Sequence, residues 1–230
     1  MNECTLNNRY YPKSFDDKVD PSRTALILID MQNEFCAETG YVARQGWDIA
    51  PMQAMAVRLK KFVATARSYV PVIHIRGQYE PAVMPPQMVE RLHRLSIAPY
   101  CQPGTSGAEF YPGFEPEPGE IVVTKPTFSA FAHTELEHIL RNLRIDTVIV
   151  TGTFTNVCVD STVRDAYFRG FYTVIPEDLC AAPDFDIHRA TLETLGQFFG
   201  VVVPSDQIVQ SWSKHDRVRG TPRRCHYVGR

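Results

Sequence analysis

The sequence predicts an α/β fold with three layers, built on a doubly wound, mostly parallel six-stranded sheet of the Rossmann-like kind. Apolar segments of strand length alternate with amphipathic segments of helix length along most of the chain. The first strand candidate is a continuous apolar run, which is typical of a parallel strand buried on both faces. Parallel neighbours need a crossover, normally a right-handed helix, so this alternation predicts helices on both faces of the sheet.

Each element follows from its local pattern. The predicted strands cover residues 24–30, 72–76, 121–125, 147–152, 172–175 and 201–203. Residues 50–70 have the length of a helix, and residues 133–143, 159–170 and 188–199 carry apolar side chains at helical spacing. Gly170 is expected to end the third of these helices. A shorter helix is predicted over about 87–95.

The chain is expected to contain one domain over residues 24–212, after an N-terminal extension over 1–23. Residues 77–119 carry eight prolines and few periodic apolar residues, so they are predicted to form a cover loop over a site. Residues 213–230 form a basic C-terminal tail with six Lys or Arg and one Asp, expected to be disordered or to lie on a neighbouring subunit. The remaining residues therefore have a formal net charge of −7, which the tail partly cancels.

Composition excludes several classes of protein. A net charge of −2 gives no sign of a nucleic-acid or anionic-membrane partner, and no apolar run approaches the length of a membrane span. The first eleven residues are polar and lack a signal-peptide core, so a cytoplasmic protein is expected. Six cysteines without a close pair favour reduced thiols over a disulfide framework or a zinc cluster.

Three polar residues are expected to meet at one edge of the sheet. Asp30 ends the first predicted strand, Lys125 ends the third, and Cys158 follows the fourth at about the start of a helix. Ligands of open parallel sheets bind beyond the carboxyl ends of the strands. A cation and a helix N-terminus stabilise a thiolate, and a carboxylate can carry the thiol proton to a leaving amine. Together with N–H groups in the turn at 153–158, this set predicts acyl transfer from an amide to water.

Three sequence blocks carry a resemblance to a known family. They read Leu-Ile-Asp-Met-Gln-Asn over 28–33, Lys-Pro over 125–126, and Gly-Thr-Phe-Thr-Asn-Val-Cys-Val-Asp-Ser-Thr-Val-Arg-Asp over 152–165. These blocks resemble the signatures of the isochorismatase-like cysteine hydrolases. The resemblance implies Cys158 as nucleophile, Asp30 as proton carrier and Lys125 as electrostatic partner, in a cofactor-free hydrolysis that releases ammonia through a thioester. It also implies a non-proline cis peptide before Phe154, which turns the N–H groups of Phe154 and Cys158 into an oxyanion hole.

Further segments are most similar to one branch of this superfamily. Residues 125–131, the acidic pair at 177–178 and the Phe-Phe-Gly segment at 198–200 resemble ureidoacrylate amidohydrolases, with biuret hydrolases and N-carbamoylsarcosine amidases as relatives. The implied activity is hydrolysis of a non-peptide C–N bond in a small ureido, carbamoyl or other linear amide. Leu195 stands where biuret hydrolases place a glutamine, which disfavours biuret itself.

Other functions stay open at this point. Nicotinamidases of the superfamily carry an Asp-x-His motif and further histidines for a metal, whereas residues 76–80 contain no histidine, so we expect no metal and no cofactor. The alternatives are a biuret-, triuret- or maleamate-type amidase, or a metal-dependent nicotinamidase. A non-enzymatic alternative is a scaffold whose basic tail binds an acidic partner or RNA.

Candidate substrate-binding residues come from the loops near these strand ends. They are Asn33, Phe35, Tyr41, Arg76, Gln78, Tyr79, Phe128, Phe131 and Asn156. Arg76 is expected to bind a substrate carboxylate through two hydrogen bonds, unless it only pairs with Glu80 at the surface. Asn33 and Asn156 are expected to orient Asp30 and the turn before Cys158, although capping alone would also explain Asn156. The expected partners are a small amide and water, in a homodimer or homotetramer.

Overall fold

Seven parallel strands form one sheet in a computed structural model that describes residues 11–219, with side chains through residue 214. The strands are β1 (Thr24–Ile29), β2 (Val72–Gly77), β3 (Ile121–Lys125), β4 (Thr147–Thr153), β5 (Tyr172–Pro176), β6 (Cys180–Ala181) and β7 (Val201–Val203). Their spatial order is β3-β2-β1-β4-β5-β7, and β6 pairs with β4. The doubly wound parallel sheet is therefore confirmed, with β6 as an additional strand too short to show a pattern in the sequence.

The strand order reverses at β1, which lies between β2 and β4. Ile29 of β1 is in register with Gly152 of β4. Gly152 has a φ of +107°, and a Cβ at this position would collide with the carbonyl group of Ile29. Only glycine allows the two strands to approach so closely with this backbone conformation. Ligands of doubly wound sheets bind at the point where the strand order reverses. Here Gly152 allows β1 and β4 to approach each other closely at that point.

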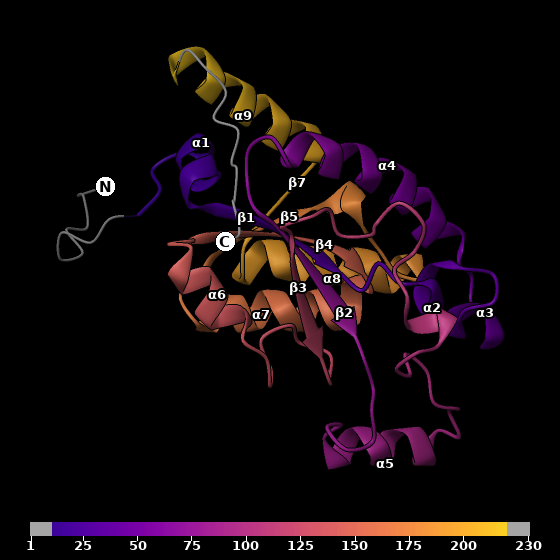
Figure 1. The fold of residues 1–230 in the computed structure, drawn as a ribbon. Coiled ribbons are helices and arrows are strands. Elements are labelled where there is room, and N and C mark those ends of the chain that lie inside the picture. Colours follow the sequence, from indigo (N-terminus) through magenta and orange to yellow (C-terminus); the bar gives the residue numbers. More distant parts are fainter. Residues whose placement is uncertain (1–10, 220–230) are drawn as a thin grey trace.

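Helices cover both faces of the sheet (Figure 1). The apolar side chains of α4 (Ala50–Ala66) and α9 (Ser205–Arg219) pack on one face, in a core that includes Leu26 and Leu28. The other face carries α6 (Leu136–Asn142), α7 (Asp160–Phe168) and α8 (Phe185–Phe198), in a core that includes Ile27 and Ile29. Successive residues of β1 therefore enter opposite cores, as a strand buried on both faces requires.

Helix ends differ from the predicted ones for local reasons. The helix α6 begins three residues later than expected, because His133 has a φ of +60° and cannot continue a helix. The helix α8 begins three residues earlier, because the Asp184 side chain accepts a hydrogen bond from the backbone N–H of Ile187. The helix α4 ends at Ala66, four residues before the predicted end.

The shorter helices lie outside the two main layers. They are α1 (Phe15–Lys18), α2 (Asn33–Cys36), α3 (Tyr41–Arg44) and α5 (Pro86–Arg94). Of these, α5 matches the helix predicted within the cover loop. Single turns of 3₁₀-helix occupy Pro21–Arg23, Ser106–Ala108 and Glu177–Leu179.

Residues at both ends of the described chain pack together. The indole of Trp212 in α9 is fully buried against Phe62 and Tyr69, and its N–H donates to the carbonyl of Val19 at 2.9 Å. The tail expected to be disordered from residue 213 is helical through residue 219, and Lys214 pairs with Asp16 at 3.0 Å. The rest of that predicted tail, residues 220–230, lies outside the described residues.

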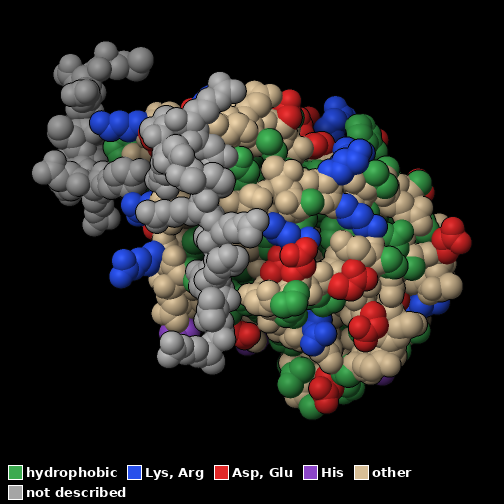
Figure 2. Space-filling model, turned by 45° about the horizontal axis from the view of Figure 1, so that its top comes forward, with side chains coloured by type: hydrophobic (Ala, Val, Ile, Leu, Met, Phe, Trp, Pro, Cys, Tyr) green, Lys and Arg blue, Asp and Glu red, His purple; other side chains and the backbone are tan. Residues whose placement is uncertain are grey.

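Acidic and basic side chains are interspersed on the face shown in Figure 2, without a broad patch of one sign among the coloured residues. No helix in the described part of the chain is long and apolar enough to cross a membrane. The expectation that nucleic acids are not partners stays a prediction.

The proline-rich segment over 77–119 packs onto the domain. Tyr79, Tyr100 and Phe114 from this segment are buried, and Phe110 forms an antiparallel bridge with Gln32. Gln32 follows β1 and holds two parts of the segment, because its side chain donates to the carbonyls of Gly77 at 3.0 Å and Ala108 at 2.8 Å. The cover is therefore tied to the end of the strand that carries Asp30.

Candidate active site

Asp30, Lys125 and Cys158 meet at the carboxyl edge of the sheet. Asp30 follows β1, Lys125 ends β3, and Cys158 lies in a π-helical turn (Thr155–Val159) between β4 and α7. The Lys125 Nζ lies 2.9 Å from the Asp30 Oδ2 and 3.4 Å from the Cys158 Sγ, and it also donates to the carbonyl of Thr127 at 3.0 Å. The side chains of Asp30 and Lys125 are both fully buried. The structure thus brings the three predicted residues into direct contact.

The local backbone places Asp30 and Cys158 under tight constraints. Asp30 has a φ of +51°, which turns the chain away from β1, and its N–H donates to the carbonyl of Ile75 at 3.0 Å. Cys158 is the fourth residue of the π-helical turn, so α7 begins two residues after it, at Asp160. The α-helix therefore starts two residues after the predicted start at the cysteine, and a π-helical turn precedes it.

Burial raises the pKa of the Cys158 thiol, the Lys125 charge opposes this rise, and the charge of Asp30 adds to it. Burial alone would lower the pKa of Lys125, but the negative charges beside it raise the pKa instead. Burial and the Lys125 charge therefore act on the pKa of the thiol in opposite directions. The thiolate expected from the sequence stays a prediction, which the Lys125 cation favours and burial opposes.

The peptide bond between Thr153 and Phe154 is cis, as the resemblance implies. The carbonyl of Phe154 accepts from the N–H groups of Val157 and Val159, both at 3.1 Å, which closes the turn that carries Cys158. The Phe154 N–H itself donates to no acceptor within the described residues. The role of this N–H in an oxyanion hole stays a prediction.

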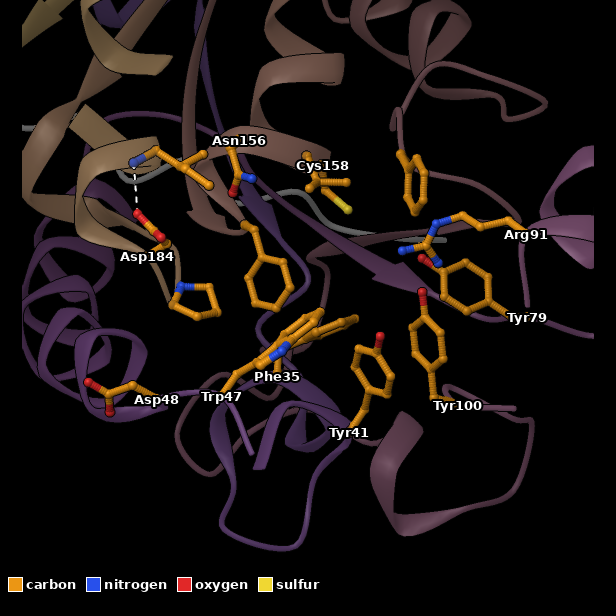
Figure 3. Close-up of a pocket in the computed structure, with 15 residues that line it drawn as sticks. Phe35, Tyr41, Trp47, Asp48, Tyr79, Arg91, Tyr100, Asn156, Cys158 and Asp184 are labelled. Atoms are coloured by element: carbon orange, nitrogen blue, oxygen red, sulfur yellow. Dashed lines mark hydrogen bonds between the residues drawn. The ribbon is translucent and has the colours of Figure 1, made fainter. Parts of the chain in front are cut away.

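A cavity of about 430 Å³ opens beside Cys158 (Figure 3). It is lined by Phe35, Tyr41, Trp47, Asp48, Tyr79, Arg91, Tyr100, Phe128, Phe154, Asn156, Val157, Cys158, Pro183, Asp184 and Ile187. Of the four cysteines whose placement is described, only Cys158 lines it, since Cys36, Cys101 and Cys180 are buried elsewhere. A cavity of this size accommodates a small organic molecule.

Seven of the fifteen residues that line the cavity are aromatic. Tyr41 and Tyr100 stack with ring centroids 4.2 Å apart, and Tyr79 meets Tyr100 edge-on at 5.0 Å. On the other side, Phe35 meets Phe154 edge-on at 5.6 Å. Burial raises the pKa values of Tyr79 and Tyr100, so both hydroxyls stay protonated and can donate hydrogen bonds. This aromatic part of the wall is therefore apolar around a few uncharged hydroxyl groups.

A buried carboxylate below this wall joins the cover to the domain. Glu34 of α2 accepts hydrogen bonds from the backbone N–H groups of Tyr41 at 2.6 Å and Cys101 at 3.2 Å, and pairs with Arg44 at 2.9 Å. Gly107 leaves room for this side chain, because a Cβ there would overlap the Glu34 carboxylate. Glu34 thus positions the stacked Tyr41 and Tyr100 rings through the backbone on either side.

Four of the predicted substrate-binding residues lie away from the cavity. The Arg76 guanidinium donates to the Thr124 hydroxyl at 3.1 Å, along the sheet between β2 and β3. Asn33 donates to the carbonyl of Ser106 at 2.8 Å and so fastens the cover loop, while Gln78 pairs through its backbone with Lys125. Phe131 packs against Phe171 in the core beneath α6 and α7. Because successive side chains of β2 point to opposite faces of the sheet, the Arg76 side chain lies along the sheet and outside the cavity.

The other five candidates line the cavity: Phe35, Tyr41, Tyr79, Phe128 and Asn156. The sequence analysis missed Trp47, Asp48, Arg91, Tyr100, Val157, Pro183, Asp184 and Ile187. For Arg91 a signal exists, since it occupies the same helical face as the apolar Met88 and Leu92 of α5. For Trp47 and Tyr100 no local pattern exists, because they reach the cavity from irregular segments.

Among the side chains that the structure describes, in residues 11–214, no group of three or more His, Cys, Asp or Glu is placed to hold a metal ion. His74 pairs with Glu120 at 2.8 Å, and His188 contacts the Thr155 hydroxyl at 2.7 Å. The expectation that the reaction needs no metal stays a prediction.

Comparisons with known proteins agree on one family. A family profile described as the isochorismatase domain matches residues 24–207. Over 237 residues the chain is 32% identical to the ureidoacrylate amidohydrolase RutB of Yersinia enterocolitica, covering 90% of this chain and 99% of that protein. Among solved structures, a cysteine hydrolase from Pseudomonas syringae has a TM-score of 0.76 at 26% identity, covering 89% of this chain and 96% of that one. An N-carbamoylsarcosine amidase from Thermoplasma acidophilum has a TM-score of 0.66 at 26% identity, covering 80% and 97% respectively.

Proposed function

The chain belongs to the isochorismatase family and is a hydrolase that acts on C–N amide bonds, and from this premise we propose that it cleaves a small ureido or carbamoyl amide by attack of Cys158. The single observation that carries the proposal is the contact of buried Lys125 with both Asp30 and Cys158, of which Cys158 lines the cavity. Lys125 holds Asp30 and Cys158 in one buried cluster, which supports Asp30 as the acceptor of the thiol proton.

The first half of the reaction forms an acyl-enzyme. The Cys158 Sγ attacks the carbonyl carbon of the substrate while the Asp30 carboxylate takes the thiol proton. The N–H groups of Phe154 and Cys158 hold the oxygen that becomes negative. Asp30 then gives its proton to the leaving nitrogen, ammonia departs, and a thioester on Cys158 remains.

The second half returns the enzyme to its starting state. Asp30 takes a proton from a water molecule, the resulting hydroxide attacks the thioester carbon, and the C–S bond breaks. The proton on Asp30 passes to the Cys158 sulfur, which restores the thiol. A ureido substrate leaves as a carbamic acid, which loses carbon dioxide to give an amine. Throughout, Lys125 stays charged and stabilises each negative charge beside it.

Ammonia release over a panel of amides tests this proposal. The panel contains ureidoacrylate, biuret, triuret, N-carbamoylsarcosine, maleamate and nicotinamide. We expect a ureido or carbamoyl compound to be the best substrate, and Cys158→Ala to retain less than about 0.1% of the native rate. The matched control is Cys180→Ala, which removes a buried thiol that does not line the cavity. Substantial activity in Cys158→Ala would contradict the proposal.

The same panel separates the alternatives. A preference for biuret, triuret or maleamate would indicate the corresponding amidase of the same family instead. Inhibition by a chelator together with turnover of nicotinamide would indicate a metal-dependent nicotinamidase instead. Removal of residues 220–230 tests the scaffold alternative, because loss of binding to an acidic partner or RNA with unchanged kinetics would reveal a second role. Cytoplasmic location and a homodimer or homotetramer stay predictions, the latter open to measurement of the mass in solution.

A further inference from the structure

Arg91 extends from the cover into the same cavity as Cys158. It belongs to α5, whose Met88 and Leu92 are buried against the domain, so that the adjoining Arg91 side chain turns inward as well. Figure 3 shows the guanidinium directed into the cavity, near the labelled Tyr79 and Tyr100. The helix α5 is thus fixed by two apolar anchors that hold a cation over the site.

The guanidinium of Arg91 forms no ion pair with any residue that the structure describes, and its buried Nη1 has no hydrogen-bond partner there. It lies 5.7 Å from the centre of the Phe128 ring and acts on the Tyr41 hydroxyl, where it opposes the rise in pKa that burial causes. By contrast, Arg94 on the outer face of α5 pairs with Glu90 at 2.9 Å. Arg91 is therefore a cation whose matching anion is absent from its own surroundings.

We propose that Arg91 is the residue of this cavity that selects a charged substrate, by binding a carboxylate of the molecule whose amide Cys158 attacks. This inference rests on the proposed function, since it assumes that the cavity holds the amide attacked by Cys158. An arginine can donate two parallel hydrogen bonds to a carboxylate, and a partly desolvated site strengthens them. The role expected of Arg76 from the sequence is thereby assigned to Arg91, because Arg76 lies outside the cavity.

The remaining polar groups of the cavity fit this orientation. The Asn156 Oδ1 is buried without a partner and can accept from an N–H of the substrate amide. In the view of Figure 3, Cys158 is drawn between Asn156 and Arg91, so an amide at the thiol has an acceptor on one side and a cation on the other. Two carboxylates also line the cavity, but Asp48 and Asp184 accept from the backbone N–H groups of Ala50 and Ile187 and are drawn on the side opposite Arg91.

The test compares one charged and one neutral substrate. Ammonia release is measured with ureidoacrylate and with its methyl ester, whose ester cleavage produces no ammonia. In the native enzyme we expect a higher kcat/KM for the acid. Arg91→Met should lower kcat/KM for the acid by about 10- to 100-fold, mainly through KM, and change it for the ester by less than about threefold. Arg91→Lys keeps the charge but loses the paired hydrogen bonds, so it should fall between native and Arg91→Met.

Arg94→Met is the matched control, since it removes an arginine from the outer face of the same helix, and it should leave both substrates unchanged. Equal losses on acid and ester in Arg91→Met, or no loss on either, would overturn the proposal and leave Arg91 a structural residue.

Different results would show that the proposed reaction, and not the role of Arg91, is wrong. If native protein releases no ammonia from any amide of the panel, or if Cys158→Ala is fully active, the reaction assignment fails. Arg91 is then judged by calorimetric binding of ureidoacrylate and its methyl ester to the native protein. Tighter binding of the acid, lost in Arg91→Met, would support the carboxylate site; equal binding of the two, or binding of neither, would overturn it.

Discussion

Removing one member of the buried Asp30–Lys125 pair should cost far more stability than removing both. The two side chains are 2.9 Å apart and fully buried. Lys125→Met fills the same space with an apolar chain but leaves the carboxylate buried without its cation, for which we expect a loss of about 3–5 kcal/mol in the free energy of unfolding. In the double variant Asp30→Asn/Lys125→Met no buried charge remains, so the loss should be about 1–2 kcal/mol.

Urea unfolding followed by the fluorescence of Trp47 and Trp212 measures these values. A chain of this size loses about 2–3 kcal/mol of unfolding free energy per molar urea, so Lys125→Met should lower the midpoint by about 1–2 M. The double variant should recover most of that shift, which gives a coupling energy of a few kcal/mol between the two sites. A Lys125→Met midpoint within about 0.3 M of native, or losses that simply add in the double variant, would refute the reasoning.

Three further predictions follow from groups already described. Because burial raises the pKa of the Cys158 thiol, alkylation of the free enzyme by iodoacetamide should be slower at pH 7 than that of free cysteine and should rise about tenfold per pH unit; mass spectrometry would locate the label, and a rate that levels off below pH 8 would contradict the buried thiol. Glu34→Gln should lower the free energy of unfolding by about 1–3 kcal/mol and raise KM more than it lowers kcat, because the Tyr41 backbone loses a charged acceptor; unchanged steady-state kinetics would argue against a positioning role. Although burial favours the neutral acid, hydrogen bonds from His74 and from Arg67 lower the pKa of Glu120 to about 2, so its contribution to stability is present above about pH 4.5 and lost as the pH falls through about 2; the stability gap between native and Glu120→Gln should close over that range, and a gap independent of pH would count against this assignment.

The sheet and its polar strand ends could be predicted because their signals are local. A strand buried on both faces has to be apolar throughout, and the six predicted strands lie within two residues of the observed ones. Asp30 and Lys125 interrupt that apolar rule where their strands end, and Cys158 follows a strand end within a few residues. Parallel pairing then brings the three together without any knowledge of long-range packing.

The cavity wall could be predicted only in part because it depends on the path of the cover. Arg76 and Arg91 are equally plausible carboxylate ligands by residue type, but one side chain lies along the sheet and the other on an anchored helix. Which of them faces the thiol depends on how the segment over 77–119 folds back, and its contacts with Gln32 and Glu34 span 45 to 76 residues of sequence. Such pairings leave no periodic pattern.

The bond between Trp212 and the carbonyl of Val19 joins positions 193 residues apart. During synthesis the N-terminal residues and the apolar side of α4 leave the ribosome long before α9 exists to cover them. This face of the core therefore stays exposed until residue 212 has been made, and covering it requires a contact between distant parts of the sequence. Synthesis of α9 thus sets the moment at which this apolar surface of the nascent chain is covered.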